Sequence, residues 1–258
     1  MKKIVKGFTL VELIIVMAIL VILMAGIMNM FKPIRATFVD STAYENQRTS
    51  QNGMVTYITE SVRYATDLGM YTNGEVSNVD GAVDAFITEY LKANNITDAT
   101  DKTRIEEAIS KQAEVIIIDN ENTYDFGADG NTYKGRILRR KFDGNEITED
   151  AEDVTKTTKC RLALGEAYYG KSNYSIVFTI TQDASTKKGN AADGIGVTVS
   201  SQALHNLDDT SKVISTNGFI LCKNLDAPIN GMFDTTKYNS GNATNKNVYI
   251  VYINEKIR

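Results

Sequence analysis

The sequence predicts an α+β protein in which a long N-terminal α-helix precedes an antiparallel β-sheet. Three observations support this prediction. A basic leader runs into an uncharged apolar segment, an apolar stripe with helical spacing follows it, and the apolar period changes to two after about residue 113. We therefore expect one helix of two halves, an apolar half and an amphipathic half, with the amphipathic half packed on the sheet.

The apolar segment is long enough to cross a membrane. The leader carries Lys2, Lys3 and Lys6, and no charge occurs between Leu13 and Met28. As a helix, Phe8 to Phe31 is about 36 Å long, which exceeds the roughly 30 Å hydrocarbon core of a bilayer. Cytoplasmic flanks are enriched in Lys and Arg. We therefore expect a single-pass cytoplasmic-membrane protein with its N-terminus inside and its body outside.

A carboxylate stands inside the start of this segment. Glu12 lies one helical turn beyond Phe8 and on the same face. A charge at the centre of a bilayer costs about 2.5–3.5 kcal/mol on insertion scales, and less near an interface. A positively charged partner would offset this cost, and a free amine on Phe8, from the same or a neighbouring chain, would supply one. The alternative is an interfacial acid without a role.

The string Lys6-Gly7-Phe8-Thr9-Leu10-Val11-Glu12-Leu13, followed by an apolar helix, resembles the class III signal of type IV prepilins and pseudopilins. The resemblance implies that a prepilin peptidase cuts between Gly7 and Phe8 and methylates Phe8. It also implies that Glu12 recruits the subunit to a growing filament. The implied partners are other pilin subunits in a helical filament, the prepilin peptidase, the cytoplasmic membrane, and an assembly platform with its ATPase.

These features divide the chain into four expected segments. Residues 1–7 form the cleaved leader, 8–32 the transmembrane and filament-core half-helix, 33–68 the amphipathic half-helix, and 69–258 an extracytoplasmic α+β body. Within the body we expect a helical excursion over 69–113 and mainly β-structure over 114–258.

We expect Pro33 to interrupt the first helix, because a proline removes a backbone hydrogen bond and clashes with the preceding turn. The stretch Ser41–Gly53 is polar and predicts little core beside it. Beyond it, the apolar stripe consists of Val55, Ile58, Val62 and Ala65. Asp67-Leu68-Gly69 is the expected end of the helix, with Gly69 as a left-handed cap.

Within the body, two shorter helices are expected. One covers Gly81–Ala93 with Asp80 as its cap, and the other runs from Thr100 or Asp101 to Ala113. The candidate strands are Glu114–Asp119, Tyr133–Asp143, Tyr174–Thr181, Ile195–Leu204, Lys212–Ser215 with Gly218–Lys223, and Asn247–Asn254. Long surface loops are expected over 146–159, 186–192 and 233–246.

The sequence offers little for catalysis. His205 is the only histidine, and neither a Gly-x-Ser-x-Gly motif nor a Gly-rich phosphate loop is present. We therefore predict a protein that is not an enzyme and needs neither a cofactor nor a metal. The two cysteines, Cys160 and Cys222, either form a disulfide or remain two separate buried thiols. A net charge of −4 argues against nucleic acid as a partner.

Two charged stretches allow further hypotheses. Asp119-Asn120-Glu121-Asn122 and residues 125–131 contain enough oxygen ligands for calcium, but they do not follow the order of an EF-hand loop. The basic residues Arg136, Arg139, Arg140 and Lys141 form a strand that either contacts a neighbouring subunit or anionic partner, or faces solvent.

The expected function is that of a structural subunit of a type IV pilus or related filament, at the cell surface or in the periplasm. The large body favours a minor pilin. Two alternatives are a pseudopilin of a type II secretion or competence system, and a tip adhesin or binding module anchored by the same helix. A membrane-anchored enzyme has no supporting set of residues.

Overall fold

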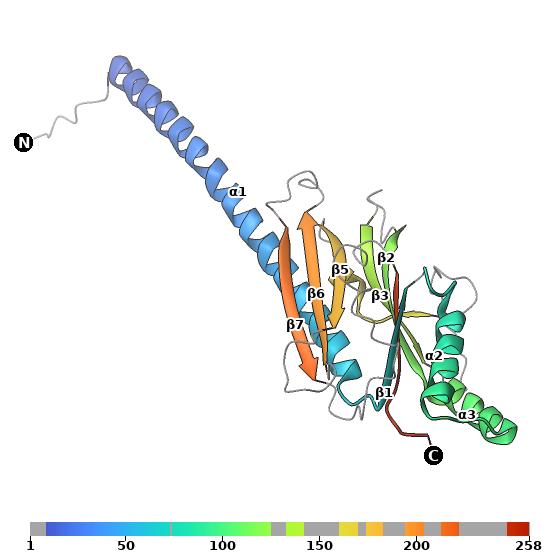
Figure 1. Ribbon diagram of the computed structural model, residues 1–258. Coiled ribbons are helices and arrows are strands. Elements are labelled where there is room, and N and C mark those ends of the chain that lie inside the picture. Colours follow the sequence, from blue (N-terminus) through green and yellow to red (C-terminus); the bar gives the residue numbers. More distant parts are fainter. Residues whose placement is uncertain are drawn as a thin grey trace, which may run out of the picture. The chain divides into compact units, whose positions relative to one another are not determined.

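The computed structural model describes residues 9–72, 74–124, 133–141, 160–169, 174–182, 194–203, 213–221 and 247–257. It shows the expected α+β class, with a long N-terminal helix and antiparallel sheets (Figure 1). The chain forms two compact units, residues 1–46 and 47–258. The three expected long loops lie outside the described residues.

Helix α1 runs without a break over Leu10–Val62, a length of 53 residues. Pro33 lies inside it, so the expected interruption is wrong. A proline removes only one backbone N–H, and the residues on both sides keep their own helical hydrogen bonds. The hydroxyl of Thr37 also donates to the carbonyl oxygen of Pro33 at 2.9 Å. The two predicted halves are therefore one continuous helix.

The C-terminal end of α1 differs from the prediction. The helix ends at Val62, and Asp67–Thr72 forms strand β1, which pairs antiparallel with β8 (Val248–Ile253). Gly69 is part of this strand and does not cap a helix. A Cβ atom there would lie 2.9 Å from the Tyr71 hydroxyl and 3.0 Å from the Phe86 ring. The partner of β1 comes from the far end of the chain, so local pattern could not reveal the strand.

The larger sheet has five strands in the order β1-β8-β2-β3-β4, and all neighbours are antiparallel. Its other members are β2 (Glu114–Tyr124), β3 (Tyr133–Lys141) and the two-residue β4 (Arg161–Leu162). The strands expected from Glu114, Tyr133 and Asn247 are thus confirmed. Neither β4 nor the following 3₁₀ turn η1 (Glu166–Tyr169) was expected, because both are too short to show a period.

Both faces of this sheet are buried. The C-terminal part of α1, with Met54 and Ile58, packs on the face that contains Ile116 and Ile118. Helices α2 (Val79–Ala93) and α3 (Ala99–Gln112) cover the opposite face (Figure 1). Strands covered on both faces are apolar at successive positions. Burying each large apolar side chain contributes about 1.5–3 kcal/mol.

The caps of α2 and α3 lie slightly before the predicted ones. The Asn78 side-chain oxygen accepts from the Gly81 N–H at 2.8 Å and caps α2. The Asp98 carboxylate accepts from the N–H groups of Thr100 and Asp101 and caps α3. Asp80, the predicted cap, instead forms an ion pair with Arg140 of β3.

A second sheet has three antiparallel strands in the order β5-β6-β7, namely Tyr174–Gln182, Gly194–Ala203 and Ile214–Leu221. The last of these was expected as two separate pieces. This sheet packs on the C-terminal part of α1, where a Cβ atom on Gly218 would lie 2.0 Å from Cγ1 of Val55. Glycine at this position therefore lets β7 approach the helix closely.

The contact between α1 and this second sheet is partly polar. Gln51 is fully buried, and its side-chain amide donates to the Ser201 hydroxyl at 2.8 Å and to the Ile214 carbonyl at 2.7 Å. Its side-chain oxygen accepts from Thr216 at 2.8 Å, and that of Gln47 accepts from Ser201 at 3.0 Å. We expected little core beside Ser41–Gly53, and this expectation is wrong at Gln47 and Gln51. Both side chains are buried, because hydrogen bonds within the body satisfy their polar groups.

Candidate functional site

Glu12 lies in the first turn of α1, where it forms a reciprocal pair with Thr9. The N–H and the hydroxyl of Thr9 both donate to Oε2 of Glu12 at 2.9 Å. In return, the N–H of Glu12 donates to Oγ1 of Thr9 at 3.3 Å. This arrangement is a capping box, which satisfies backbone N–H groups that the first helical turn leaves without partners.

The capping box leaves part of the carboxylate available. Both contacts from Thr9 reach Oε2, and Oε1 of Glu12 forms no hydrogen bond or ion pair with any described residue. The side chains of Thr9 and Glu12 are exposed. A helix N-terminus also favours negative charge. Glu12 can therefore accept a further donor, such as the amine of another chain, while it still caps its own helix.

Gly7, Phe8 and Glu12 were expected at this site from the sequence, whereas Thr9 was missed. The signal for Thr9 was present, because Ser or Thr followed three positions later by Glu is the spacing of a capping box. Gly7 and Phe8 lie outside the described residues, so cleavage and methylation at this bond stay predictions. Thr9 and Glu12 are brought together by the first turn of the helix itself.

The unit formed by residues 1–46 exposes an unusual amount of apolar surface. The large apolar side chains from Leu10 to Val39 that the structure describes are 43% exposed or more. Among the described residues, α1 is the one helix that is long and apolar enough to cross a membrane. Monomeric soluble proteins rarely show such a continuous patch. Such a surface fits a helix that a lipid bilayer or the apolar helices of other chains cover.

The three arginines of β3 each form an ion pair within the body. Arg136 pairs with the buried Asp119 at 3.0 Å, Arg139 pairs with Glu114 at 2.6 Å, and Arg140 pairs with Asp80. Each guanidinium is thus matched by a carboxylate of the same body. These pairings within the body were not expected from the sequence, and the Arg139 side chain remains 41% exposed.

Glu114 of β2 lies close to Tyr252 of β8, Arg139 of β3 and Tyr57 of α1. The Tyr252 hydroxyl donates to Oε2 of Glu114 at 2.8 Å. Burial and the nearby Glu114 carboxylate raise the pKa of Tyr252 well above its usual value. Burial also raises the pKa of Tyr57, which packs beside Arg139. The hydrogen bond and the ion pair of Glu114 connect β2 to β8 and β3, so this cluster links neighbouring strands of the larger sheet.

The calcium hypothesis has no support within the described residues. Asp119 is fully buried and bound to Arg136, and a guanidinium beside a carboxylate opposes cation binding there. The part of the chain that the structure describes has no cluster of three His, Cys, Asp or Glu residues able to hold a metal. Residues 125–131 lie outside that part.

The two cysteines and the histidine are not brought together in a described site. Cys160 is buried, whereas Cys222 and His205 lie outside the described residues, so the disulfide stays a prediction.

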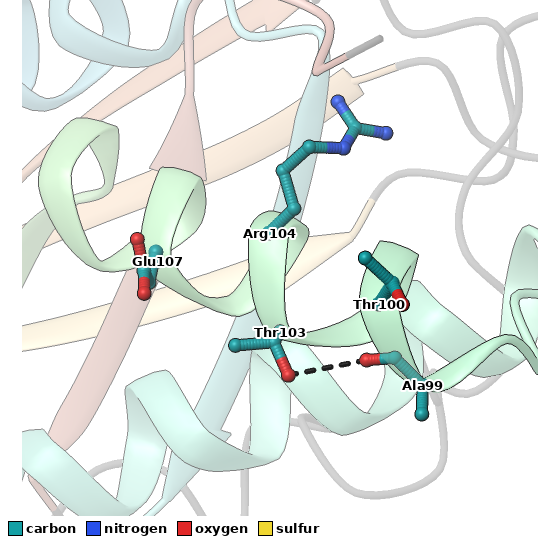
Figure 2. Close-up of a pocket in the computed structure, with 5 residues that line it drawn as sticks. All are labelled: Ala99, Thr100, Thr103, Arg104 and Glu107. Carbon is teal, nitrogen blue, oxygen red and sulfur yellow. Dashed lines mark hydrogen bonds between the residues drawn. The ribbon is translucent and has the colours of Figure 1, made fainter.

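A surface hollow lies along α3 (Figure 2). It is lined by side chains of this helix alone, where the Thr103 hydroxyl donates to the Ala99 carbonyl at 3.1 Å. The charged residues that line it, Arg104 and Glu107, are exposed or partly exposed and lie on the open helix surface. The hollow therefore offers no enclosed set of groups for a ligand.

Comparison with known families gives a match at the N-terminus. Residues 2–28 match the family described as the prokaryotic N-terminal methylation motif. This match supports a type IV pilin-like protein. Comparisons with curated proteins and with solved structures found no match for the chain.

The pilin-like assignment agrees with the fold. A long apolar helix followed by an antiparallel sheet, in an α+β arrangement, is consistent with a type IV pilin-like protein. The motif implies processing by a prepilin peptidase and assembly with other pilins, and it fits a membrane anchor before assembly. Families with this motif are structural.

Proposed function

We propose that this pilin-like chain is a structural subunit of a type IV pilus or related filament. One observation carries the proposal. The methylation motif over residues 2–28 leads directly into an exposed apolar helix whose first turn holds Glu12 in a capping box. In the membrane, lipid covers the apolar surface of this helix. In the filament, the helices of neighbouring subunits replace the lipid.

The proposed order of events begins with cleavage between Gly7 and Phe8 and methylation of Phe8. The capping box survives this cut, because Thr9 and Glu12 both lie after it. Oε2 of Glu12 then remains hydrogen-bonded to Thr9, and Oε1 accepts a hydrogen bond from a positively charged amine. Because charge-assisted hydrogen bonds are strong in a low-dielectric environment, this contact would favour docking of the correct subunit.

Mass spectrometry of the mature N-terminus tests this proposal. The expected product begins at N-methylated Phe8 in cells that contain the prepilin peptidase, and at Met1 in cells that lack it. A Gly7→Leu variant serves as the matched control and is expected to keep its leader. An intact Met1 terminus in the presence of an active peptidase would overturn the proposal.

Among subunits of type IV pili and related filaments we favour a minor pilin, because the body is larger than is common for a major pilin. A pseudopilin of a secretion or competence system has the same signal and is the alternative. Deleting the gene distinguishes them: loss of surface pili supports the first and loss of protein secretion or DNA uptake supports the second. A tip adhesin predicts a different result, namely normal filaments with a defect in binding to cells.

A further inference from the structure

A charge-free stretch of α1 has the length of the hydrocarbon core of a membrane. No Asp, Glu, Lys or Arg occurs from Leu13 to Phe31. As a helix this stretch is about 28 Å long, close to the roughly 30 Å core of a bilayer. When the stretch fills the core, Glu12 stands at one boundary and Lys32 at the other. Because α1 continues through Pro33, the residues beyond this boundary keep helical spacing.

Two cations follow the charge-free stretch directly. Lys32 and Arg35 are both exposed, and side chains three positions apart are neighbours on the surface of a helix. Arg35 lies about 6 Å past Phe31 along the helix axis. The polar headgroup layer on each side of the core is roughly 5–8 Å thick. Both cations therefore lie at the level of the lipid phosphates.

No carboxylate of the same helix compensates these two charges within the headgroup layer. The next acidic residue along the chain is Asp40, about 14 Å past Phe31 and thus beyond the layer. Neither Lys32 nor Arg35 forms an ion pair with a described residue. The arginines of β3, by contrast, each pair with a carboxylate. The pair on α1 therefore suits an anion from outside the chain.

The apolar side chains beside the cations favour a lipid over a soluble anion. Phe31 and Ile34 are 62% and 61% exposed. A soluble anion would contact only the two cations, whereas an anionic phospholipid offers phosphate oxygens to the cations and acyl chains to Phe31 and Ile34. The guanidinium of Arg35 matches phosphate oxygens with two parallel donors. Apolar residues next to Lys or Arg are typical of segments that bind at a membrane surface.

Membrane topology does not account for this cation pair. In the expected orientation Lys32 and Arg35 lie on the outer side of the membrane, whereas Lys and Arg are enriched on cytoplasmic flanks. The three lysines of the leader already satisfy that rule on the other side. A pair of cations on the outer flank weakens the charge asymmetry, so its presence favours a separate role.

We propose that Lys32 and Arg35, with Phe31 and Ile34, form a binding site for an anionic phospholipid at the end of the membrane span. This inference rests on the proposed function, because it concerns the subunit in the membrane before assembly. The bound lipid fixes the depth of the helix in the bilayer. It must be released when the subunit leaves the membrane. Anionic lipid therefore favours the membrane-bound subunit over the assembled one.

Tryptophan fluorescence tests this site. The chain contains no tryptophan, so Phe31→Trp places a single fluorophore beside the two cations. The purified full chain is reconstituted in phosphatidylcholine vesicles that contain equal amounts of either brominated phosphatidylglycerol or brominated phosphatidylcholine. Bromine quenches a tryptophan that the lipid contacts. We expect a preference for phosphatidylglycerol of about two- to five-fold, because one cation near an anionic surface contributes about five-fold. Added salt should reduce this preference.

Charge-removing variants in the same background show which residues carry the preference. The K32Q/R35Q variant should be quenched equally by both lipids. Arg48→Gln is the matched control, because Arg48 is an exposed cation of α1 about 26 Å past Phe31 and should not affect the preference. Quenching by brominated phosphatidylcholine verifies that each variant is inserted. An unchanged preference in K32Q/R35Q overturns the proposed site.

These measurements separate this inference from the proposed function. If both brominated lipids quench the tryptophan at position 31 equally while Lys32 and Arg35 are intact, the helix is in the membrane and only the lipid site is wrong. If neither lipid quenches it, position 31 does not lie in the membrane. That result would contradict the membrane stage on which the proposed function depends.

Discussion

Gly135 of β3 lies against the backbone carbonyl of Ile176 in β5, so closely that a Cβ atom on residue 135 would be 2.1 Å from that oxygen. The glycine has a φ of +85°, in the region that other residues rarely adopt. This contact joins the five-stranded sheet to the three-stranded sheet. The packing of the two sheets therefore requires glycine at position 135, and the sequence around this position does not indicate that requirement.

We expect Gly135→Ala to destabilise the body by at least about 2–3 kcal/mol, because a left-handed backbone and a clash with main-chain atoms act together. Urea unfolding of the detergent-solubilised chain, followed by near-ultraviolet circular dichroism, measures the effect. Gly165→Ala is the control, since a Cβ atom there meets nothing within 4 Å. Equal stability of the two variants would contradict the role of the close approach.

Gln51→Ala should cost about 1–3 kcal/mol, because it leaves the buried partners of its side-chain amide without hydrogen bonds. Ser201 and the Ile214 carbonyl lose a donor, and Thr216 loses an acceptor. The free energy of unfolding in urea is the measurement. Asn52→Ala, at an exposed neighbouring position of α1, should change it by no more than about 0.5 kcal/mol.

Removing Asp119 should destabilise the body more than removing an exposed carboxylate. Asp119→Ala leaves the guanidinium of Arg136 buried without its ion-pair partner, which typically costs about 3–5 kcal/mol. Asp101→Ala breaks the exposed pair with Arg104 and should cost less than about 1 kcal/mol. A thermal melt of each variant would show the difference, and similar melting temperatures would argue against a structural ion pair.

The body should lose stability at high pH. Burial and Glu114 raise the pKa of Tyr252, and burial raises the pKa of Tyr169, above the value of about 10 in an unfolded chain. A raised pKa contributes stability that is complete below about pH 10 and is lost as the pH rises further, since the unfolded chain ionises first. Melting temperatures measured from about pH 8 to 11 should fall steeply above about pH 10. Tyr252→Phe should flatten this fall, whereas the exposed Tyr64→Phe should not.

For the N-terminus, we expect Glu12→Ala to be cleaved normally but to enter filaments poorly. The substitution removes both the capping contact with Thr9 and the acceptor for another chain. Thr9→Val separates the two effects, since it keeps the carboxylate and its backbone N–H contact and loses only the hydroxyl. Immunoblots of sheared and cell fractions compare the variants. Wild-type incorporation of Glu12→Ala would refute the assembly role.

The sequence alone determined the elements whose cause is local. The apolar segment and the stripe of Val55, Ile58 and Val62 depend on residues within one or two helical turns. The capping box of Thr9 and Glu12 is equally local, although it was not predicted. The long strands were predictable for the same reason, because alternation and runs of β-branched residues are visible in sequence. The signal at Gly7 and Phe8 is likewise contiguous, and this short stretch was enough to suggest the family.

Tertiary structure decided whatever depends on distant partners. Strand β1 exists because β8, at the other end of the chain, pairs with Asp67–Thr72, and the local pattern there suggested a helix end. Gln51 can be buried because Ser201 and Thr216 form hydrogen bonds with its side chain. Arg136 and Arg140 of β3 form ion pairs because carboxylates from other elements lie next to them. Whether a polar residue is buried depends on such partners, because a polar side chain can satisfy its hydrogen bonds in water as well as in the protein. The sequence around the residue therefore does not reveal its burial.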